Sequence, residues 1–372
     1  MSFWSERKKR PQVIQGMTLR TLLKVLARND FQVDAACLGR LSYLMVLGVF
    51  NSIYGSCETY FNTEDIQATS IEHSPLFIIG HWRSGTTHLH NLLNLDEHFC
   101  CPTAYQALFP HHFVFSQAGG VLFNFLAPNK RPMDNVAFSA DTPHEDEFAL
   151  AAHCATSPYM KVLFPVTGDN NFSPFDMKEL PPEDVARWKS SFLLFLKKLT
   201  LSEGRRIVLK SPPHTCRIST LLEMFPDAKF VHIVRNPYVV YESTHKLWRD
   251  SLAYAHLQVP PPERVDELIL TWYEELFRLL ERDKELIPAG ALYEMKFEDL
   301  ESNPVKVLET MYNSLDLPGF DLQTKRVEDY LNSIRGYQKN VHRLTDANRE
   351  KVATRWRRTF EQYGYSLEDS VG

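Results

Sequence analysis

A short apolar run followed by a glycine-framed turn is the feature that most constrains this chain. Residues 75–95 read PLFIIGHWRSGTTHLHNLLNL. The run Leu76–Ile79 is typical of a buried strand, and the residues after the turn have the apolar spacing of a helix. The turn at 80–87 has the G-x-x-x-x-G-[K]-[ST] frame of a phosphate-binding loop, with Thr86 where the lysine would stand. A strand, loop and helix of this kind direct backbone N–H groups and a helix N-terminus at an anion.

The missing lysine narrows the range of ligands that this loop could bind. In nucleotide triphosphatases that side chain reaches the β- and γ-phosphates, so its loss makes ATP hydrolysis an unfavourable interpretation. The loop instead predicts a doubly substituted, diphosphate-like group. The alternative is a helix that merely follows a strand and is capped by a serine or threonine.

Two later passages predict further strands that end in cations. One is 206–210, ending in Lys210 before Ser-Pro-Pro, and the other is 229–234, followed by Arg235 before Asn-Pro. Helical patterns follow at 215–225 and 238–247, and this alternation predicts a parallel sheet. Because ligands bind outside the carboxyl ends of such strands, three strand ends offer anion-binding groups on one edge. Singly, Arg235 could be a helix cap or surface ion-pair partner, and Lys210 a solvated lysine.

These residues resemble a known family. The R-S-G-T-T run after a strand, K-S-P after a second strand, and an arginine followed eight residues later by Ser243 are similar to the PAPS-dependent sulfotransferases, closest to their bacterial and tyrosylprotein-type branch. The resemblance covers about 75–340. It implies an α/β, P-loop nucleotide-kinase-like parallel sheet flanked by helices, which binds 3′-phosphoadenosine-5′-phosphosulfate (PAPS) without a metal. The implied donor-binding residues are Arg83, Ser84, Gly85, Thr86 and Thr87 for the 5′-phosphosulfate, Arg235 and Ser243 for the 3′-phosphate, and Lys339 and Asn340 from the C-terminal side.

The chemistry of sulfuryl transfer agrees with these assignments. Arg83 and Lys210 are the predicted catalytic cations, because transfer needs charge neutralisation on the leaving oxygen. The acceptor hydroxyl also needs a general base. Family members of the tyrosylprotein and carbohydrate type place a glutamate soon after the first helix, but this chain has Gln106 there, which cannot take a proton.

Two other passages supply candidate bases. The run His144-Glu-Asp-Glu147 opens a predicted helix at 145–153, where carboxylates could simply complement the helix dipole. The functional interpretation assigns Glu145 as the base, with Glu147 as an alternative. His111 and His112 lie in an aromatic stretch, where surface histidines are the plainer interpretation; His112 is carried forward as the second candidate.

Composition limits the partners. The chain has 372 residues, 44% of them hydrophobic, a net charge of −5 and a pI near 6.3, which argues against a nucleic-acid partner. The six cysteines include no C-x-x-C pair, so they predict neither a zinc site nor a fold held together by disulfides. The polar, charged start of the chain gives no signal-peptide pattern, so a cytoplasmic location is expected.

The sequence pattern divides the chain into an N-terminal helical segment, 1–70, and the sulfotransferase domain, 71–365. Helices are predicted at 17–27 and 35–54 in the first part, and an uncharged stretch over 41–57 falls at the short end for spanning a bilayer. The segment is interpreted as a cap on the acceptor pocket or, through 35–57, as a membrane-surface contact that favours a lipid acceptor.

The remaining elements frame an acceptor side. The insert at 100–165 is rich in Phe, Pro and His and is expected to hold the acceptor. A long helix at 263–285, a strand at 292–297 and a Pro-initiated helix at 304–315 are predicted to support the core.

The predicted function is metal-independent sulfuryl transfer from PAPS to a hydroxyl or amine of a small-molecule, lipid or carbohydrate acceptor. Two alternatives stay open on the sequence: a P-loop small-molecule kinase, and a nucleotide-binding protein without catalysis. The sequence leaves the acceptor and the oligomeric state undetermined.

Overall fold

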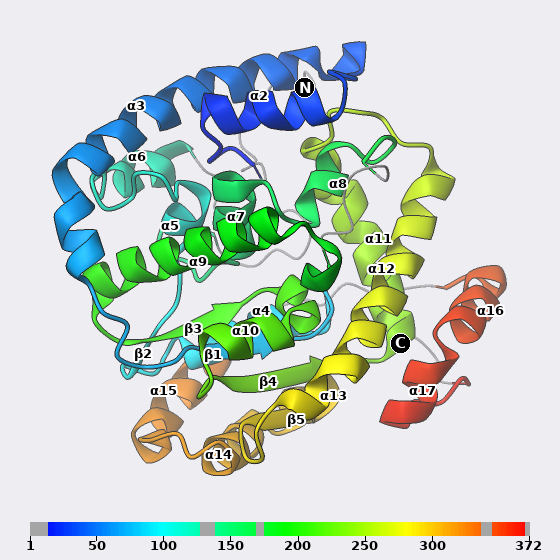
Figure 1. The fold of residues 1–372 in the computed structure, drawn as a ribbon. Coiled ribbons are helices and arrows are strands. Elements are labelled where there is room, and N and C mark those ends of the chain that lie inside the picture. The colour runs from blue at the N-terminus through cyan, green and yellow to red at the C-terminus, as the bar shows by residue number, and fades with distance from the viewer. Residues whose placement is uncertain (1–13, 127–137, 169–174, 336–343, 369–372) are drawn as a thin grey trace. The chain divides into compact units, whose positions relative to one another are not determined.

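The computed structural model describes residues 14–126, 138–168, 175–335 and 344–368. The chain forms two compact units, each assembled from separate segments (Figure 1). Unit 1 comprises 1–72, 102–204 and 246–266, and unit 2 comprises 73–101, 205–245 and 267–372. Unit 1 contains the N-terminal segment together with two later parts of the chain. The predicted division into an N-terminal segment (1–70) and a sulfotransferase domain (71–365) stays a prediction.

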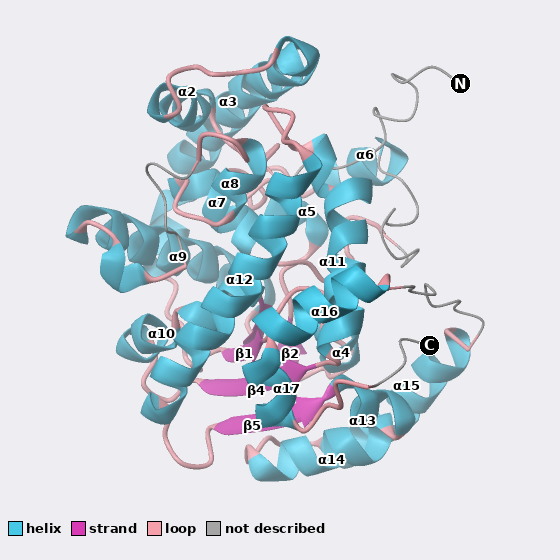
Figure 2. Cartoon of the chain, turned by 90° about the vertical axis from the view of Figure 1, so that its right-hand side faces the viewer, coloured by secondary structure: helices cyan, strands magenta, loops and turns pink. Residues whose placement is uncertain are grey.

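Unit 2 contains a parallel five-stranded sheet in the order β2-β3-β1-β4-β5 (Figure 2). The central strand β1 pairs with β3 on one side, where Ile78 is level with Lys210, and with β4 on the other, where Ile79 is level with His232. The parallel sheet and its crossover helices confirm the predicted α/β fold class. The strands are β1 (Leu76–Ile79), β2 (Phe99–Cys100), β3 (Arg206–Lys210), β4 (Lys229–Val234) and β5 (Leu292–Lys296).

Both faces of this sheet are covered, which explains why β1 is a continuous apolar run rather than an alternating one. Leu76 and Ile78 join a core that includes residues of α4, α13 and α14. Phe77 points to the opposite face, where its ring stacks on Phe230 with centroids 5.3 Å apart and contacts His214 edge-on. All four β1 residues are therefore buried.

The helices of unit 2 follow the predicted order with shifted ends. The predicted helix at 215–225 is wrong in one respect, because Pro212 and Pro213 open a 3-10 turn and the α-helix begins only at Ile218. The unit boundary falls within α11 and α12. The elements are α4 (Thr86–Leu93), η3 (Pro212–Cys216), α10 (Ile218–Met224), α11 (Pro237–Asp250), α12 (Pro262–Asp283), η5 (Lys284–Leu286), α13 (Phe297–Ser302), α14 (Pro304–Ser314), α15 (Phe320–Ser333), α16 (Asp346–Arg355) and α17 (Arg357–Tyr363).

Unit 1 is helical over its described residues. Its core includes fully buried aromatic side chains of α9, namely Trp188, Phe192 and Phe195. Pro182 occupies the first turn of α9, where a missing N–H costs nothing. The elements are α2 (Leu19–Arg28), η1 (Ala35–Cys37), α3 (Leu38–Ala68), α5 (Ala104–Leu108), α6 (Gly119–Leu126), α7 (Glu147–Cys154), α8 (Tyr159–Leu163), η2 (Met177–Glu179), α9 (Pro182–Glu203) and η4 (Leu252–Tyr254).

Helix α3 is longer than predicted. The apolar pattern predicts a helix end near residue 54, whereas α3 ends at Ala68 and has a total length of 31 residues. Its second half is more polar and is held through buried contacts of Glu58 and Ile66 rather than by a continuous apolar face. Among the described residues, one helical segment, Ala35–Ala68, is long enough and apolar enough to cross a membrane, judged by length and composition alone.

Candidate active site

The loop between β1 and α4 has the backbone geometry of an anion cradle. Gly80 and Gly85 have φ angles of +140° and +102°, which only glycine adopts without strain, and Arg83 also has a positive φ of +69°. The Gly80 N–H donates to Thr215 Oγ1 at 2.8 Å, and Ser84 Oγ donates to the His81 carbonyl at 2.7 Å. These bonds fix the loop from within unit 2, and Thr86 and Thr87 form the first residues of α4.

Arg83 is held by the helix that follows β4. Its Nε donates to Ser243 Oγ at 2.8 Å, and Ser243 is buried in α11. Arg235 Nη1 in turn donates to the Arg83 carbonyl at 3.3 Å. The structure therefore brings Arg83, Arg235 and Ser243 into one cluster at the end of β4 and the start of α11. Two arginines in one cluster suit a multiply charged anion.

Lys210 ends β3 on the same edge of the sheet. It is level with Ile78 of β1, two residues before Gly80, so the lysine and the loop both lie at the carboxyl end of neighbouring strands. Lys210 is almost fully buried, which removes the solvated-lysine interpretation. A buried ammonium beside an anion-binding loop can offset charge on a leaving oxygen.

Phe297 is a residue of this site that the sequence analysis missed. The Arg235 guanidinium lies over its ring, 4.2 Å from the centroid. A Cβ on Gly85 would lie 2.1 Å from the same ring, so Gly85 and Phe297 are fitted to each other. The sequence offers little indication of this role, because Phe297 directly follows β5 and has the apolar character of a last core residue of that strand.

Glu298 supports the same arginine. Its Oε1 accepts from the Asn236 backbone N–H at 3.0 Å, and its Oε2 accepts from the Tyr365 hydroxyl at 2.9 Å. Burial lowers the pKa of Arg235 from its ordinary value, and the negative charge of Glu298 works against that shift. The arginine therefore keeps its charge at neutral pH.

An aromatic wall backs the first residues of the loop. The His81 ring lies 5.0 Å from Tyr273 and the Trp82 ring 5.5 Å from Trp272, between centroids. Burial lowers the pKa of His81 to about 4, and its Nδ1 lies 2.8 Å from the Trp82 carbonyl, so the neutral imidazole donates there. The Trp356 ring stacks on Tyr273 with centroids 3.6 Å apart and extends this aromatic wall.

Glu145 belongs to unit 1 and lies just before α7. The predicted helix at 145–153 is wrong at its start, because α7 begins at Glu147. Glu145 is half-buried, and its Oε2 accepts from the Tyr159 hydroxyl at 2.6 Å. Glu147 is fully buried in the helix. Of these two carboxylates, Glu145 keeps the exposure that a proton acceptor for a substrate requires, and its role stays a prediction.

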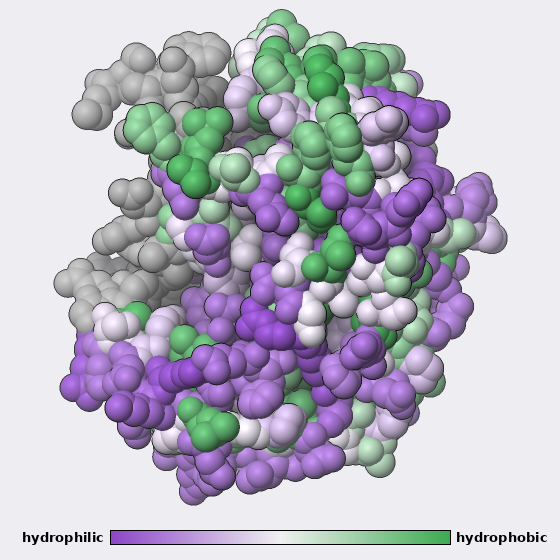
Figure 3. All heavy atoms as spheres, turned by 90° about the vertical axis from the view of Figure 1, so that its left-hand side faces the viewer, coloured by the Kyte–Doolittle hydropathy of each residue, from purple (hydrophilic) through white to green (hydrophobic). Residues whose placement is uncertain are grey.

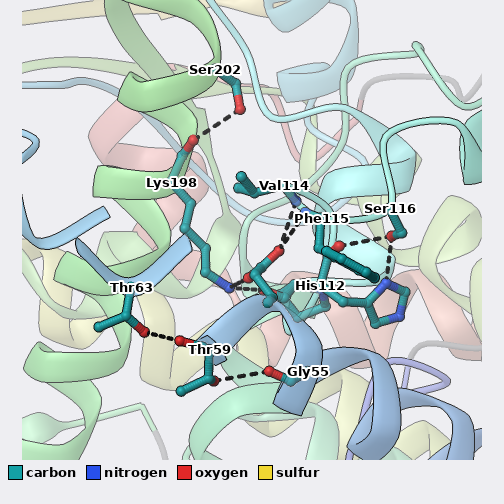
Figure 4. Close-up of polar contacts among 11 residues, drawn as sticks. Gly55, Thr59, Thr63, His112, Val114, Phe115, Ser116, Lys198 and Ser202 are labelled. Carbon is teal, nitrogen blue, oxygen red and sulfur yellow. Dashed lines mark hydrogen bonds and ion pairs between the residues drawn. The ribbon is translucent and has the colours of Figure 1, made fainter. Parts of the chain in front are cut away.

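His112 is committed to a buried network in unit 1 (Figure 4). Asn51 Nδ2 donates to the Gln15 and Met17 carbonyls at 2.7 and 2.9 Å, so its Oδ1 must face His112 Nε2, 3.2 Å away, as an acceptor. The other ring nitrogen lies 2.7 Å from Ser116 Oγ. Burial lowers the pKa of His112 to about 4. Because both nitrogens have protein partners, His112 is the weaker of the two predicted bases.

The remaining predictions have different outcomes. Gln106 is the N3 residue of a capping box on α5, where its Oε1 accepts from the Thr103 N–H at 2.9 Å, which explains a glutamine at this position. His111 Nε2 lies 3.3 Å from the Ala152 carbonyl, and burial lowers its pKa to about 4. Lys339 and Asn340 lie outside the described residues. Within the described ranges, no three His, Cys, Asp or Glu side chains gather as a metal site, and metal independence stays a prediction.

The fold and site together define a P-loop-like α/β protein with a lysine-free anion cradle. The strand order, the glycine-framed loop after the central strand and the cations at the neighbouring strand ends all belong to unit 2. An arrangement of this kind suits a phosphate-containing ligand at one edge of a parallel sheet.

Comparisons with known proteins agree. A family model described as "Sulfotransferase family" matches residues 75–321. The chain is 33% identical over 350 residues to the omega-hydroxy-beta-dihydromenaquinone-9 sulfotransferase Stf3 of Mycobacterium tuberculosis, covering 94% of this chain and 90% of that protein. The corresponding protein of Mycobacterium bovis gives the same values.

Solved structures show the same fold. Sulfotransferase STF9 from Mycobacterium avium superposes with a TM-score of 0.67 at 18% identity, covering 95% of this chain and 98% of that one. Sulfotransferase STF1 from Mycobacterium tuberculosis gives a TM-score of 0.63 at 16% identity, covering 91% of each chain. The chain therefore belongs to the sulfotransferase family and is a sulfotransferase. This sets aside the kinase and the non-catalytic nucleotide-binding protein.

Proposed function

We propose that this enzyme transfers the sulfuryl group of PAPS to the hydroxyl of a lipid acceptor that carries a long apolar chain. The observation that carries the donor assignment is the cluster of Arg83, Ser243 and Arg235 beside the loop at 80–87. Such a cluster, with backbone N–H groups, matches a nucleotide that carries both a 3′-phosphate and a 5′-phosphosulfate.

The reaction would proceed by in-line displacement. The acceptor oxygen forms a bond to sulfur while the bond from sulfur to the 5′-phosphate oxygen breaks, and adenosine 3′,5′-bisphosphate leaves. Arg83 and Lys210 would neutralise the leaving oxygen, and Arg235 with Ser243 would hold the 3′-phosphate. The acceptor proton would pass to Glu145, with His112 as the second candidate. Lys339 and Asn340 remain proposed donor contacts, and no metal is proposed.

A lipid acceptor is favoured by two observations. The Mycobacterium tuberculosis relative is named for a hydroxylated menaquinone, which carries its hydroxyl on an apolar molecule. Aromatic rings surround the proposed base, because Phe148 lies 5.1 Å from Tyr159, the hydroxyl partner of Glu145, and 4.5 Å from His144. Rings of this kind pack against quinones and unsaturated chains.

The cellular setting belongs to the same proposal. We expect a cytoplasmic enzyme that contacts the membrane surface through residues 35–57, where its acceptor would be dissolved. The six cysteines, none of them in a disulfide, are compatible with a reducing compartment.

Titration calorimetry without metal tests the donor site. The proposal expects binding of adenosine 3′,5′-bisphosphate that is unaffected by EDTA and stronger than that of Mg·ATP. Arg83→Ala and Lys210→Ala should each lose most sulfuryl transfer. Activity within about twofold of wild type in both variants would refute this site, since neutralising a leaving group is worth at least about tenfold.

Acceptor and base need separate assays. Radiolabelled PAPS should label ω-hydroxylated prenylquinones in preference to sugars or phenols, and a sugar preference would overturn the lipid assignment. Glu145→Gln should lower turnover by about 10²–10⁴-fold while nucleotide affinity is retained. Normal turnover in Glu145→Gln, together with loss in His112→Gln, would move the base to His112.

A further inference from the structure

Helix α3 has two faces with opposite chemistry. One stripe is buried, and it includes the polar residues Asn51 and Glu58. Away from that stripe, large apolar side chains are exposed over several turns, and Figure 3 shows hydrophobic residues gathered over this part of unit 1. These exposed residues of α3 are Tyr43, Met45, Val46, Val49, Phe50, Ile53, Tyr54, Tyr60 and Phe61.

The segment 115–125 extends this exposed face. Phe115 stacks on Phe61 of α3, with ring centroids 5.6 Å apart and planes within 7°. Helix α6 begins four residues later and exposes Val121, Leu122 and Phe125 by 78, 61 and 87%. We call the exposed apolar residues of α3, Phe115 and these three residues of α6 the outer apolar surface. Contiguous apolar area of this kind marks an interaction site.

The buried stripe shows that α3 lies on unit 1 instead of crossing a bilayer. Glu58 forms a buried ion pair with Lys198, and its Oε2 accepts from the backbone N–H groups of Val114 and Phe115 at 2.8 and 3.1 Å (Figure 4). Lys198 Nζ also donates to the Pro110 carbonyl at 2.7 Å. In a spanning helix these charged groups would leave their partners and enter hydrocarbon, at a cost of several kcal/mol. A helix with one polar, protein-bound face and one apolar face suits the plane of a membrane surface.

Positive charge lies close to the outer apolar surface. Helix α2 packs against α3, where the Leu19 N–H donates to Ser52 Oγ at 3.1 Å. The next residue, Arg20, and Lys24 one turn later on α2 are both exposed. Basic groups beside an apolar face complement anionic lipid headgroups.

We infer that the outer apolar surface docks on the surface of an anionic lipid bilayer, with Arg20 and Lys24 of α2 adding electrostatic attraction. This inference extends the proposed membrane contact of 35–57 to Phe115 and α6, and it commits to a bilayer as the occupant instead of a second copy of the chain. Vesicle binding is measured without nucleotide or acceptor, so it stands or fails separately from sulfuryl transfer.

Vesicle flotation of the full chain tests the apolar part. Wild type should float with phosphatidylcholine vesicles and more strongly when phosphatidylglycerol is included. The variant Val46→Glu/Phe50→Glu/Ile53→Glu changes three side chains that are 54–57% exposed, and it should lower partitioning by more than about tenfold. Val259→Glu is the matched control, since Val259 is 62% exposed in unit 1 outside this surface, and it should bind as wild type does. Circular dichroism checks that both variants fold.

The charge part needs its own variant. Arg20→Gln/Lys24→Gln should lower binding to phosphatidylglycerol vesicles by about tenfold and leave phosphatidylcholine binding unchanged. Absence of wild-type flotation, or equal flotation of the triple glutamate variant, would overturn the inference. So would a dimer in light scattering that the triple variant dissolves, because the surface would then be a contact between copies. Unchanged binding of the Gln variant to phosphatidylglycerol vesicles would refute the role of Arg20 and Lys24.

Discussion

Removal of the Ser243 hydroxyl should weaken donor-nucleotide binding with little effect on the fold. In the structure this hydroxyl accepts from Arg83 Nε at 2.8 Å and is buried in α11. A hydrogen bond to a charged group is worth about 1.5–3 kcal/mol, which corresponds to about 10- to 150-fold in a dissociation constant. Because Arg83 is half-buried and can recruit water, we expect Ser243→Ala to lie near the lower end, at about tenfold.

Calorimetry with adenosine 3′,5′-bisphosphate measures this loss, and the neighbouring residue provides the control. Thr244 is equally buried, but its hydroxyl donates to the Val240 carbonyl within the same helix at 2.7 Å. Thr244→Val should therefore leave nucleotide affinity unchanged. If the two variants lose the same affinity, Ser243 acts only through the packing of α11, and the assignment of Arg83 and Ser243 to the donor site is refuted.

Three further predictions concern stability. Gly85→Ala would place a Cβ 2.1 Å from the Phe297 ring at a φ of +102°, so the free energy of unfolding should fall by at least about 1–3 kcal/mol and nucleotide affinity should fall with it, as measured by urea unfolding and calorimetry. Lys198→Met leaves its carboxylate partner buried and should cost about 3–5 kcal/mol of unfolding free energy in urea. His81 has its pKa lowered to about 4, so between pH 6.5 and 4 the unfolded chain binds a proton that the folded chain does not; stability should fall by about 1.4 kcal/mol per pH unit as pH drops, in urea titrations compared with His81→Gln.

Each of these has a control or a contrary outcome. Gly290 also has a positive φ, of +79°, but a Cβ there meets no atom within 4 Å, so Gly290→Ala should cost less than Gly85→Ala. Lys197→Met changes the half-buried lysine next to Lys198, whose Nζ donates to the Gln67 carbonyl at 2.7 Å, and should cost no more than about 1.5 kcal/mol. An unfolding free energy with the same pH slope in wild type and His81→Gln would contradict the assigned protonation of His81.

The loop at 80–87 and the cations beside it were predictable because these residues are set by local backbone chemistry. A positive φ at Gly80 and Gly85 requires glycine, and the apolar run Leu76–Ile79 marks a strand covered on both faces. Lys210 and Arg235 could be assigned to one edge because parallel strands end on the same side. Phe297 escaped prediction because it lies more than two hundred residues after Gly85 in the chain, as the first residue of α13.

From sequence alone, the glycine-framed loop and the strand-end cations predicted an anion site at one edge of a parallel sheet, and the resemblance of their motifs to sulfotransferases implied the class of this protein. Tertiary structure decided which side chains do structural work. It assigned His112 to a buried network with Asn51, and it showed that α3 buries Glu58 while exposing an apolar face. The physical reason is that backbone conformation is encoded over a few residues, whereas burial and hydrogen-bond partners depend on segments that meet only after folding.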